Sequence, residues 1–249
     1  MATAAKHLVT RLTRFPTFVT GSARQTMASL APRKRFSSTG REAVVLVPGA
    51  FCTSSVMNGL GRQLEAQGLQ VILPGNLPYF WGPLANLCPI EDAVRELLWD
   101  VTKTVRTRGI RKFWLAGHSN GGLIALLAID MAADEGFPDF PGMVKGVITM
   151  ATPFRGVDLA PLLSPVIPVC GDIGAESRVL ARAARLKDRV KLCLKSTDDF
   201  LVLPECQTPE GIKPVAMKGF NHMDFFVGSP AQVKRTATLI KECVDAARN

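Results

Sequence analysis

Short apolar runs alternate with longer amphipathic stretches from residue 42 to the C-terminus. Apolar runs that end at Pro, Gly or polar residues are typical of buried strands. Six strands are expected, at Glu42–Val47, Leu69–Leu73, Phe113–Ala116, Val144–Met150, Val190–Leu194 and Pro214–Lys218. Four helices are expected, at Ser54–Gln67, Glu91–Arg108, Gly122–Ala133 and Ala231–Ala247. Strands that alternate with helices predict an α/β domain, with a mostly parallel central sheet covered by helices on both faces.

The chemically interesting residues follow the ends of these strands. Pro48 and Gly49 follow the first strand, Ser119 the third, Asp198 and Asp199 the fifth, and His222 the last. Ligands of parallel α/β sheets bind beyond the carboxyl ends of the strands. The pattern therefore predicts one site at that edge of the sheet.

The stretch Gly117-His118-Ser119-Asn120-Gly121 has a serine at its centre, between an apolar strand and the apolar run Gly122–Ala128. Small residues two before and two after the serine allow a strained turn that lifts the hydroxyl clear of the sheet. The helix that follows directs its free N–H groups and the positive end of its dipole to the same point. We therefore predict that Ser119 is a nucleophile. The alternative is a serine that caps the helix N-terminus.

The chain contains three histidines. His7 lies in the basic N-terminal tail, and His118 lies inside the turn, where its side chain leaves beside the nucleophile. His222 remains as the general base for Ser119. A serine hydroxyl becomes a good nucleophile when an imidazole takes its proton, and a carboxylate orients that imidazole.

Five stretches in this order resemble the lipase and esterase branch of the α/β-hydrolase superfamily. They are Val47–Phe51, Gly117–Gly122, Thr152–Gly156, Asp199–Val202 and Asn221–Phe225, within a resemblance that covers about Ala43 to Val244. The resemblance implies the α/β-hydrolase fold with a minimal cap, and one domain over residues 42–249. It also implies a triad in the chain order serine, aspartate, histidine.

The resemblance favours Asp199 as the triad acid, because the superfamily pattern places a valine three residues after the aspartate. Asp198 is the alternative. The oxyanion hole would consist of the backbone N–H groups of Asn120 and Ala50, with Phe51 as second choice for the latter. Lipases often carry His-Gly where this chain has Pro48-Gly49, but backbone donors do not need that histidine. No metal or organic cofactor is implied.

The resemblance implies serine-dependent hydrolysis of a carboxylic ester, with a small-molecule or lipid ester as substrate, by a carboxylesterase or lipase that forms an acyl-enzyme. A thioesterase or an acyltransferase would use the same triad. A non-catalytic α/β-hydrolase-like binding protein is the alternative outside enzymes. The apolar stretch Leu162–Val169 could contact lipid at a membrane surface or serve as a packed connector. The oligomeric state is left open.

Charge is concentrated at the N-terminus. Of 30 Lys and Arg residues, eight lie in residues 1–41, which contain none of the 21 Asp and Glu, so the net charge of +9 falls to +1 for residues 42–249. The domain therefore has no electrostatic footprint for nucleic acid. The Arg-rich, acid-free tail predicts a mitochondrial transit peptide, disordered or cleaved, with Arg35-Phe36-Ser37-Ser38 as a cleavage site. A cytoplasmic protein with a basic N-terminus is the alternative.

Two further patterns bear on the compartment. The six cysteines show no metal-ligand spacing and predict free thiols in a reducing environment. The sequence has no run of about 18 apolar residues, as a transmembrane helix would need.

Overall fold

The computed structural model describes residues 20–36, 42–75, 86–158 and 160–247. Its centre is a six-stranded sheet in the order β2-β1-β3-β4-β5-β6, in which all neighbouring strands are parallel. The strands are β1 (Ala43–Val47), β2 (Gln70–Ile72), β3 (Phe113–His118), β4 (Val144–Met150), β5 (Val190–Ser196) and β6 (Val215–Met217). The predicted parallel sheet is confirmed, and its carboxyl ends meet at one edge.

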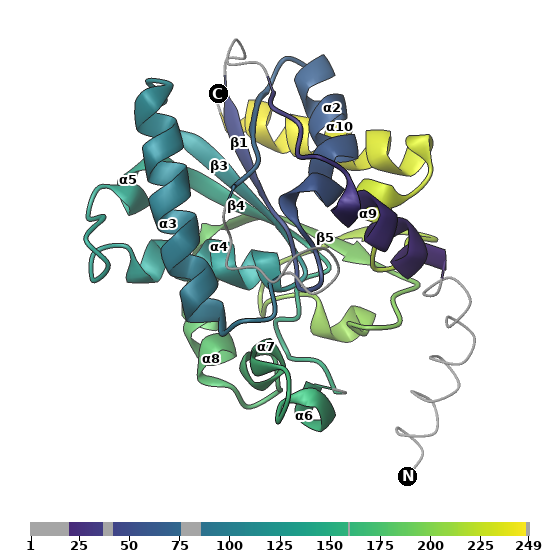
Figure 1. The fold of residues 1–249 in the computed structure, drawn as a ribbon. Helices are drawn as coiled ribbons and strands as arrows, with labels where there is room; N and C mark the ends of the chain where they lie inside the picture. Colours follow the sequence, from purple (N-terminus) through teal and green to yellow (C-terminus); the bar gives the residue numbers. More distant parts are fainter. Residues whose placement is uncertain (1–19, 37–41, 76–85, 159, 248–249) are drawn as a thin grey trace.

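Helices cover both faces of the sheet (Figure 1). On one face lie α3 (Ile90–Thr107), α4 (Asn120–Met131), α5 (Phe140–Met143) and α8 (Arg178–Arg185). On the other face lie α2 (Asn58–Ala66), α9 (Asp224–Val227) and α10 (Pro230–Ala246). The short helices α6 (Ala160–Leu163) and α7 (Pro168–Asp172) follow β4, and single turns of 3₁₀ helix lie at η1 (Ser54–Met57), η3 (Lys187–Arg189) and η4 (Pro204–Cys206).

Strand β1 shows how the sheet separates two cores. Val45 and Val47 point into the core under α3 and α4, while Val44 and Leu46 point into the core under α2 and α10. Successive side chains of a strand alternate between faces. Because both faces are buried, such strands appear in the sequence as unbroken apolar runs.

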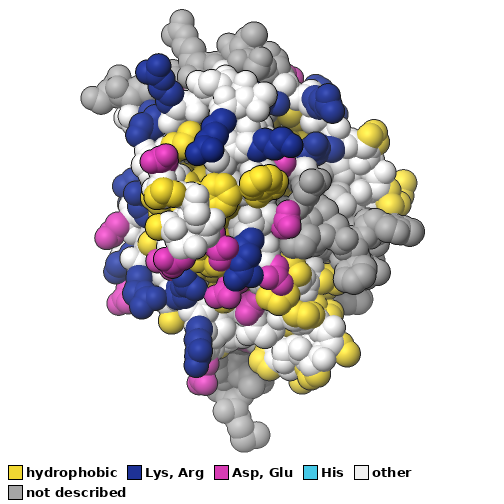
Figure 2. Space-filling view, turned by 60° about the vertical axis from the view of Figure 1, so that its left-hand side comes forward, with side chains coloured by type: hydrophobic (Ala, Val, Ile, Leu, Met, Phe, Trp, Pro, Cys, Tyr) yellow, Lys and Arg dark blue, Asp and Glu magenta, His cyan; other side chains and the backbone are white. Residues whose placement is uncertain are grey.

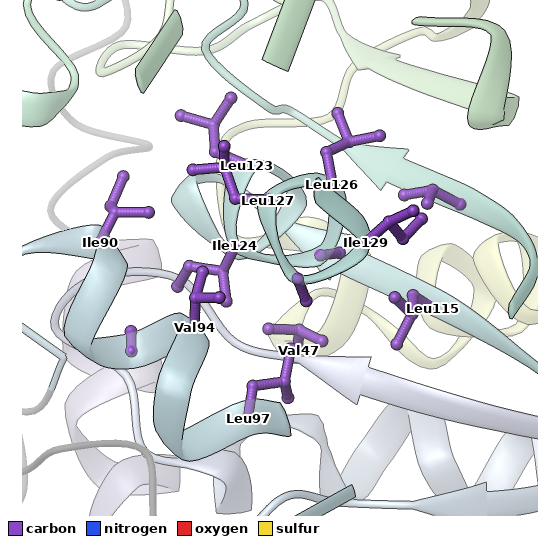
Figure 3. Close-up of a cluster of buried hydrophobic side chains, with 14 of the residues drawn as sticks. Val47, Ile90, Val94, Leu97, Leu115, Leu123, Ile124, Leu126, Leu127 and Ile129 are labelled. Atoms are coloured by element: carbon purple, nitrogen blue, oxygen red, sulfur yellow. The ribbon is translucent and has the colours of Figure 1, made fainter. Parts of the chain in front are cut away.

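Helix α4 occupies the centre of the first core. All of its residues except Asp130 are buried, as expected for a helix that is apolar on every side. Figure 3 shows its Ile124 and Leu127 beside Ile90 and Val94 of α3. This packing fixes the position of the helix that begins directly after Ser119.

The observed elements differ from the predicted ones at their ends and in the short helices. Strand β3 runs to His118 and α4 begins at Asn120, so Ser119 alone joins them. Helices α5 to α9 were not predicted. They contain four to eight residues, and helices this short are stable only through tertiary contacts.

Part of the basic tail is folded against the domain. Residues 20–30 form a helix, here called the N-terminal helix, and residues 31–36 continue from it as an extended strap. Phe36 at the end of the strap is buried in the core beneath α2. The structure describes residues 20–36 on the domain surface, whereas the sequence predicts a transit peptide, disordered or cleaved, over residues 1–41. Removal of the tail stays a prediction.

Candidate active site

Ser119 lies at a strained turn. Its backbone angles are φ 54° and ψ −131°, a conformation that costs free energy in a residue with a side chain. The turn is fixed by its neighbours: the Ser119 N–H donates to the carbonyl oxygen of Met150 at 2.8 Å, and α4 begins at the next residue. The described residues contain three other non-glycine residues with positive φ, namely Phe51, Asn86 and Ala151.

Three glycines make the turn possible. A Cβ atom on Gly117 would overlap the backbone of Gly121, and one on Gly121 would lie 2.6 Å from the carbonyl oxygen of Pro48. A Cβ atom on Gly122 would overlap the hydroxyl of Thr152. The start of α4 therefore packs so closely on the ends of β1 and β4 that no side chain fits there.

The loop after β1, here called the oxyanion loop (residues 48–52), lies beside the serine. A Cβ atom on Gly49 would be 2.8 Å from the Cβ of Ser119. Asn86 Nδ2 donates to the carbonyl oxygens of Pro48 (3.3 Å) and Gly49 (3.0 Å). No described residue accepts a hydrogen bond from the backbone N–H of Ala50 or Asn120. The role of these two N–H groups as oxyanion donors stays a prediction.

On the other side of the site, His222 contacts a carboxylate. Its Nδ1 lies 2.7 Å from Asp199 Oδ2, and both side chains are buried. Nδ1–H therefore donates to the carboxylate, which leaves Nε2 as a proton acceptor. Asp198 is exposed, and its backbone N–H donates to the Phe220 carbonyl oxygen at 2.9 Å. The structure thus brings Asp199 rather than Asp198 to the imidazole.

His118 lies against the ring of His222. The ring centroids are 4.6 Å apart, and His118 Nε2 is 2.7 Å from the backbone carbonyl oxygen of His222, so Nε2 carries the hydrogen and donates it. Burial, followed by the neighbouring imidazole of His222, holds the pKa of His118 well below its usual value. His118 is therefore a neutral donor that holds the loop of His222.

The loop that carries His222 is also closed by its own side chains. Asp224 Oδ2 accepts from the Asn221 N–H at 2.8 Å, and Asn221 Oδ1 accepts from the Met223 N–H at 2.8 Å. No hydrogen bond joins Ser119 to His222 among the described residues. Catalytic hydrogen bonds are often long in unliganded enzymes and shorten when substrate binds.

No family model matches this chain, and no curated protein matches it in sequence. Solved structures match its fold. A monoacylglycerol lipase from Paleococcus ferrophilus superposes with a TM-score of 0.57 at 18% identity, over 84% of this chain and 98% of the lipase. An α/β-hydrolase enzyme from the metagenome of lagoon sediments at Mar Chica, Morocco, gives 0.57 at 18% identity, over 85% and 94% of the two chains. An extracellular α/β-hydrolase from a Paenibacillus species gives 0.56 at 16%, over 81% and 98%. The chain has the α/β-hydrolase fold.

Within the α/β-hydrolase fold, Gln207 and Ser196 donate hydrogen bonds to Asp199, the predicted acid of the triad. The sequence did not indicate either residue. Gln207 Nε2 donates to Asp199 Oδ2 at 3.0 Å, and the hydroxyl of Ser196 donates to the same oxygen at 2.8 Å. The other oxygen, Oδ1, accepts from the backbone N–H groups of Leu201 (2.9 Å) and Val202 (3.0 Å). With His222, five donors surround this buried carboxylate. Polar residues in irregular segments follow no period, so no sequence signal marked Gln207.

The cap of this α/β-hydrolase domain is small. Helices α6 and α7 lie at the carboxyl edge of the sheet (Figure 1), and the Val157 N–H after β4 donates to the Ile173 carbonyl oxygen at the end of α7. Leu162 and Val166 are 75% and 79% exposed. The sequence also offers three aromatic residues, Tyr79, Phe80 and Trp81, as a lining for an acyl entrance, and these lie outside the described residues. Within the described ranges, no helix is both long enough and apolar enough to cross a membrane.

Proposed function

We propose that the protein is a serine hydrolase that cleaves a carboxylic ester through an acyl-enzyme. Ser119 is the nucleophile, His222 the general base, and Asp199 the carboxylate that orients it. The observation that carries the proposal is the 2.7 Å contact between His222 Nδ1 and Asp199 Oδ2, at the same edge of the sheet as a serine held at φ 54°.

The proposed reaction has two halves. His222 Nε2 accepts the Ser119 hydroxyl proton while Oγ attacks the ester carbonyl, and the imidazolium then donates that proton to the leaving alcohol. In the second half His222 takes a proton from water, the resulting hydroxide attacks the acyl carbonyl, and the imidazolium returns the proton to Ser119 Oγ as the acyl–oxygen bond breaks and the acid is released. The N–H groups of Asn120 and Ala50 stabilise the oxyanion in both halves, and one such donor typically contributes about 3 kcal/mol.

An acyl or lipid ester is the proposed substrate class. The similar structures include a lipase by name, and the cap exposes Leu162, Leu163 and Val166 beside the site edge. These side chains lie on α6 and on the turn that follows it, and exposed apolar side chains that gather on one short segment are typical of a contact with lipid or a partner. We propose a peripheral contact between this cap and lipid. Figure 2 shows acidic and basic side chains interspersed over one face of the molecule, in keeping with the net charge of +1 for residues 42–249.

Hydrolysis of a series of p-nitrophenyl esters of increasing acyl length tests the proposal, with Ser119→Ala as the matched control. We expect turnover by the wild-type protein, best with a medium or long chain, and none above background with Ser119→Ala. Acyl-CoA as a competitor distinguishes an esterase from a thioesterase or an acyltransferase, because the latter two would consume acyl-CoA in preference to the p-nitrophenyl ester. Equal rates for the wild-type protein and Ser119→Ala would remove the enzyme proposal.

Mitochondrial localisation is a separate proposal, supported by the eight basic and no acidic residues of segment 1–41. A fusion of residues 1–41 to a fluorescent protein should reach mitochondria. A diffuse cytosolic signal would replace this proposal with the cytoplasmic alternative.

A further inference from the structure

The N-terminal helix packs against the loop that carries His222. A Cβ atom on Gly21 would lie 3.3 Å from Asn221 Oδ1 and 3.5 Å from the Cβ of Met223, so the helix contacts the residues on either side of His222. Burial raises the pKa of Asp224 in the same loop, and the positive charge of nearby Arg24 opposes that rise. The helix therefore adds both close packing and a favourable charge to this side of the site.

The same helix reaches the oxyanion loop through one buried side chain. Gln25 is only 5% exposed, and its Nε2 donates to the carbonyl oxygen of Phe51 at 2.8 Å and to Cys52 Sγ at 2.9 Å. Burial raises the pKa of the Cys52 thiol to about 12, so the thiol is neutral, and the Gly49 N–H also hydrogen-bonds to its sulfur. The amide group of Gln25 thus holds the two residues that follow Ala50, and the Cys52 sulfur links Gln25 to Gly49, the residue before Ala50.

The loop needs such an anchor, because Phe51 has φ 59°. A residue other than glycine keeps this left-handed backbone conformation only where its surroundings hold it. Asn86 holds the first carbonyl groups of the loop, those of Pro48 and Gly49. Gln25 holds the carbonyl of Phe51, which lies two peptide groups after the N–H of Ala50, the predicted oxyanion donor, and one after the N–H of Phe51, the second choice.

The rest of the segment is joined to the domain along its length. The Ser29 carbonyl oxygen accepts from Thr53 Oγ1 at 3.0 Å, and Arg33 Nη1 donates to the Leu73 carbonyl oxygen at 2.9 Å. The ring of Phe36 is so close to Gly61 that a Cβ atom there would overlap it. Loss of the segment would leave buried polar groups unpaired and open a gap in the core, both of which destabilise a fold.

We propose that Gln25 is a positioning residue of the oxyanion loop, and that residues 20–36 belong to the working enzyme. The kinetic part of this proposal rests on the proposed function, since it assumes that the loop binds an oxyanion. It follows that any leader removed from the chain ends before Thr20, and not at the predicted site between Arg35 and Ser38.

Kinetics on the full-length chain test the positioning role. Gln25→Met keeps the length of the side chain and removes its donor, and Arg33→Met is the control because its contact, at Leu73, lies outside the oxyanion loop. We expect Gln25→Met to lower kcat about tenfold with KM unchanged, and to weaken an alkyl trifluoromethyl ketone, which forms a tetrahedral adduct, by about the same factor. Arg33→Met should keep wild-type values. Equal kinetics in all three proteins, or equal losses in both variants, would overturn the assignment.

Amide hydrogen exchange separates this proposal from the proposed function, because it needs no turnover. Peptides covering residues 48–53 should exchange faster in Gln25→Met than in the wild-type protein, and at the wild-type rate in Arg33→Met. If exchange responds in this way while the wild-type protein hydrolyses no ester, the proposed function is refuted, but the role of Gln25 as an anchor of the oxyanion loop is retained. Unchanged exchange in Gln25→Met would refute the anchor.

The position of the mature N-terminus tests the second part of the proposal, that residues 20–36 belong to the working enzyme. Mass spectrometry of the protein isolated from its own cells should find an N-terminus at or before Thr20. A mature N-terminus at Ser37 would show that the working enzyme lacks the segment.

Discussion

The two sides of the proposed active site are held in place by different kinds of contact. On the nucleophile side, backbone packs on backbone at Gly117 and Gly121, and Gly122 packs on the side chain of Thr152, so that none of the three leaves room for a Cβ atom. On the acid–base side, the groups are held by side-chain hydrogen bonds from Gln207 and His118. The glycines of the nucleophile side lie within one short stretch of sequence, whereas the hydrogen-bonding residues of the acid–base side lie up to about a hundred positions apart.

This difference predicts that substitutions on the two sides will impair different properties, folding on one side and turnover on the other. Steric overlap in a packed backbone cannot be relieved locally, so changes on the nucleophile side should impair folding. A side-chain hydrogen bond can be removed alone, so changes on the acid–base side should leave a folded protein with lower turnover.

The largest effect is expected for His222→Ala. Loss of the general base should lower kcat by roughly four powers of ten or more, since triad members act as a unit, in a protein that still melts cooperatively, at a midpoint lowered by the loss of a buried partner of Asp199. Steady-state kinetics with a p-nitrophenyl ester and a thermal melt are the measurements. A loss below tenfold would show that another group is the base.

Asp199→Asn should follow, with a fall in kcat of about three to four powers of ten, because an amide cannot support the imidazolium and favours the wrong tautomer. Asp198→Asn is the matched control, and it should stay within about twofold because Asp198 is exposed and the carboxylate on His222 Nδ1 is that of Asp199. A greater loss in Asp198→Asn than in Asp199→Asn would reverse the assignment of the acid.

On the nucleophile side, Gly121→Ala should lower the free energy of unfolding by about 2–3 kcal/mol, because its Cβ atom would overlap the carbonyl groups of Val47 and Pro48. For a domain of this size the thermal midpoint should fall by roughly 5–10 °C. Gly142→Ala is the control, since nothing lies within 4 Å of its Cβ position. Equal melting of the two variants would contradict the close packing of the elbow.

A smaller effect on turnover is expected for Gln207→Met. The change removes one donor to Asp199 Oδ2 at 3.0 Å, and the loss of a hydrogen bond to a charged group typically corresponds to about tenfold or more. We expect kcat to fall by about that factor while KM holds. A rise in KM with unchanged kcat would mean that Gln207 shapes the pocket and does not position the acid.

The smallest effect concerns acid stability. Because the pKa of His118 is lowered on folding, the unfolded state binds more protons below the usual histidine pKa of about 6.5. The stability contribution is therefore complete above about pH 6.5 and is lost as the pH falls below it, by up to about 1.4 kcal/mol per pH unit. His118→Gln keeps a donor and removes this titration, so its urea midpoints between pH 7 and pH 5 should fall less steeply. Parallel slopes for the two proteins would contradict the neutral buried state.

The difference between the nucleophile side and the acid–base side also explains which features could be predicted from the sequence. The sheet follows from apolar runs such as Ala43–Val47, because burial on both faces leaves a continuous pattern. The turn at Ser119 is visible because its glycines are adjacent in the chain. Gln207 could not be predicted, since a polar residue in an irregular segment becomes specific only when the fold brings it to Asp199.

The basic tail shows a second limit of sequence patterns. Its charge is typical of a transit peptide, and charge alone does not reveal that Gln25 and Phe36 are buried. Burial of a single glutamine depends on the shape of the surface that receives it. The roles of Ser119, Asp199 and His222 stay predictions, to which the structure adds the contact between Asp199 and His222.

Covalent labelling with a fluorophosphonate probe tests the central claim most directly, because the probe reacts with a serine only when that serine is activated. The account predicts one labelled peptide, modified at Ser119, in the folded wild-type protein, with no labelling of Ser119→Ala and much slower labelling of His222→Ala. A folded wild-type protein that takes up no probe, or a Ser119→Ala variant that labels equally well, would contradict it.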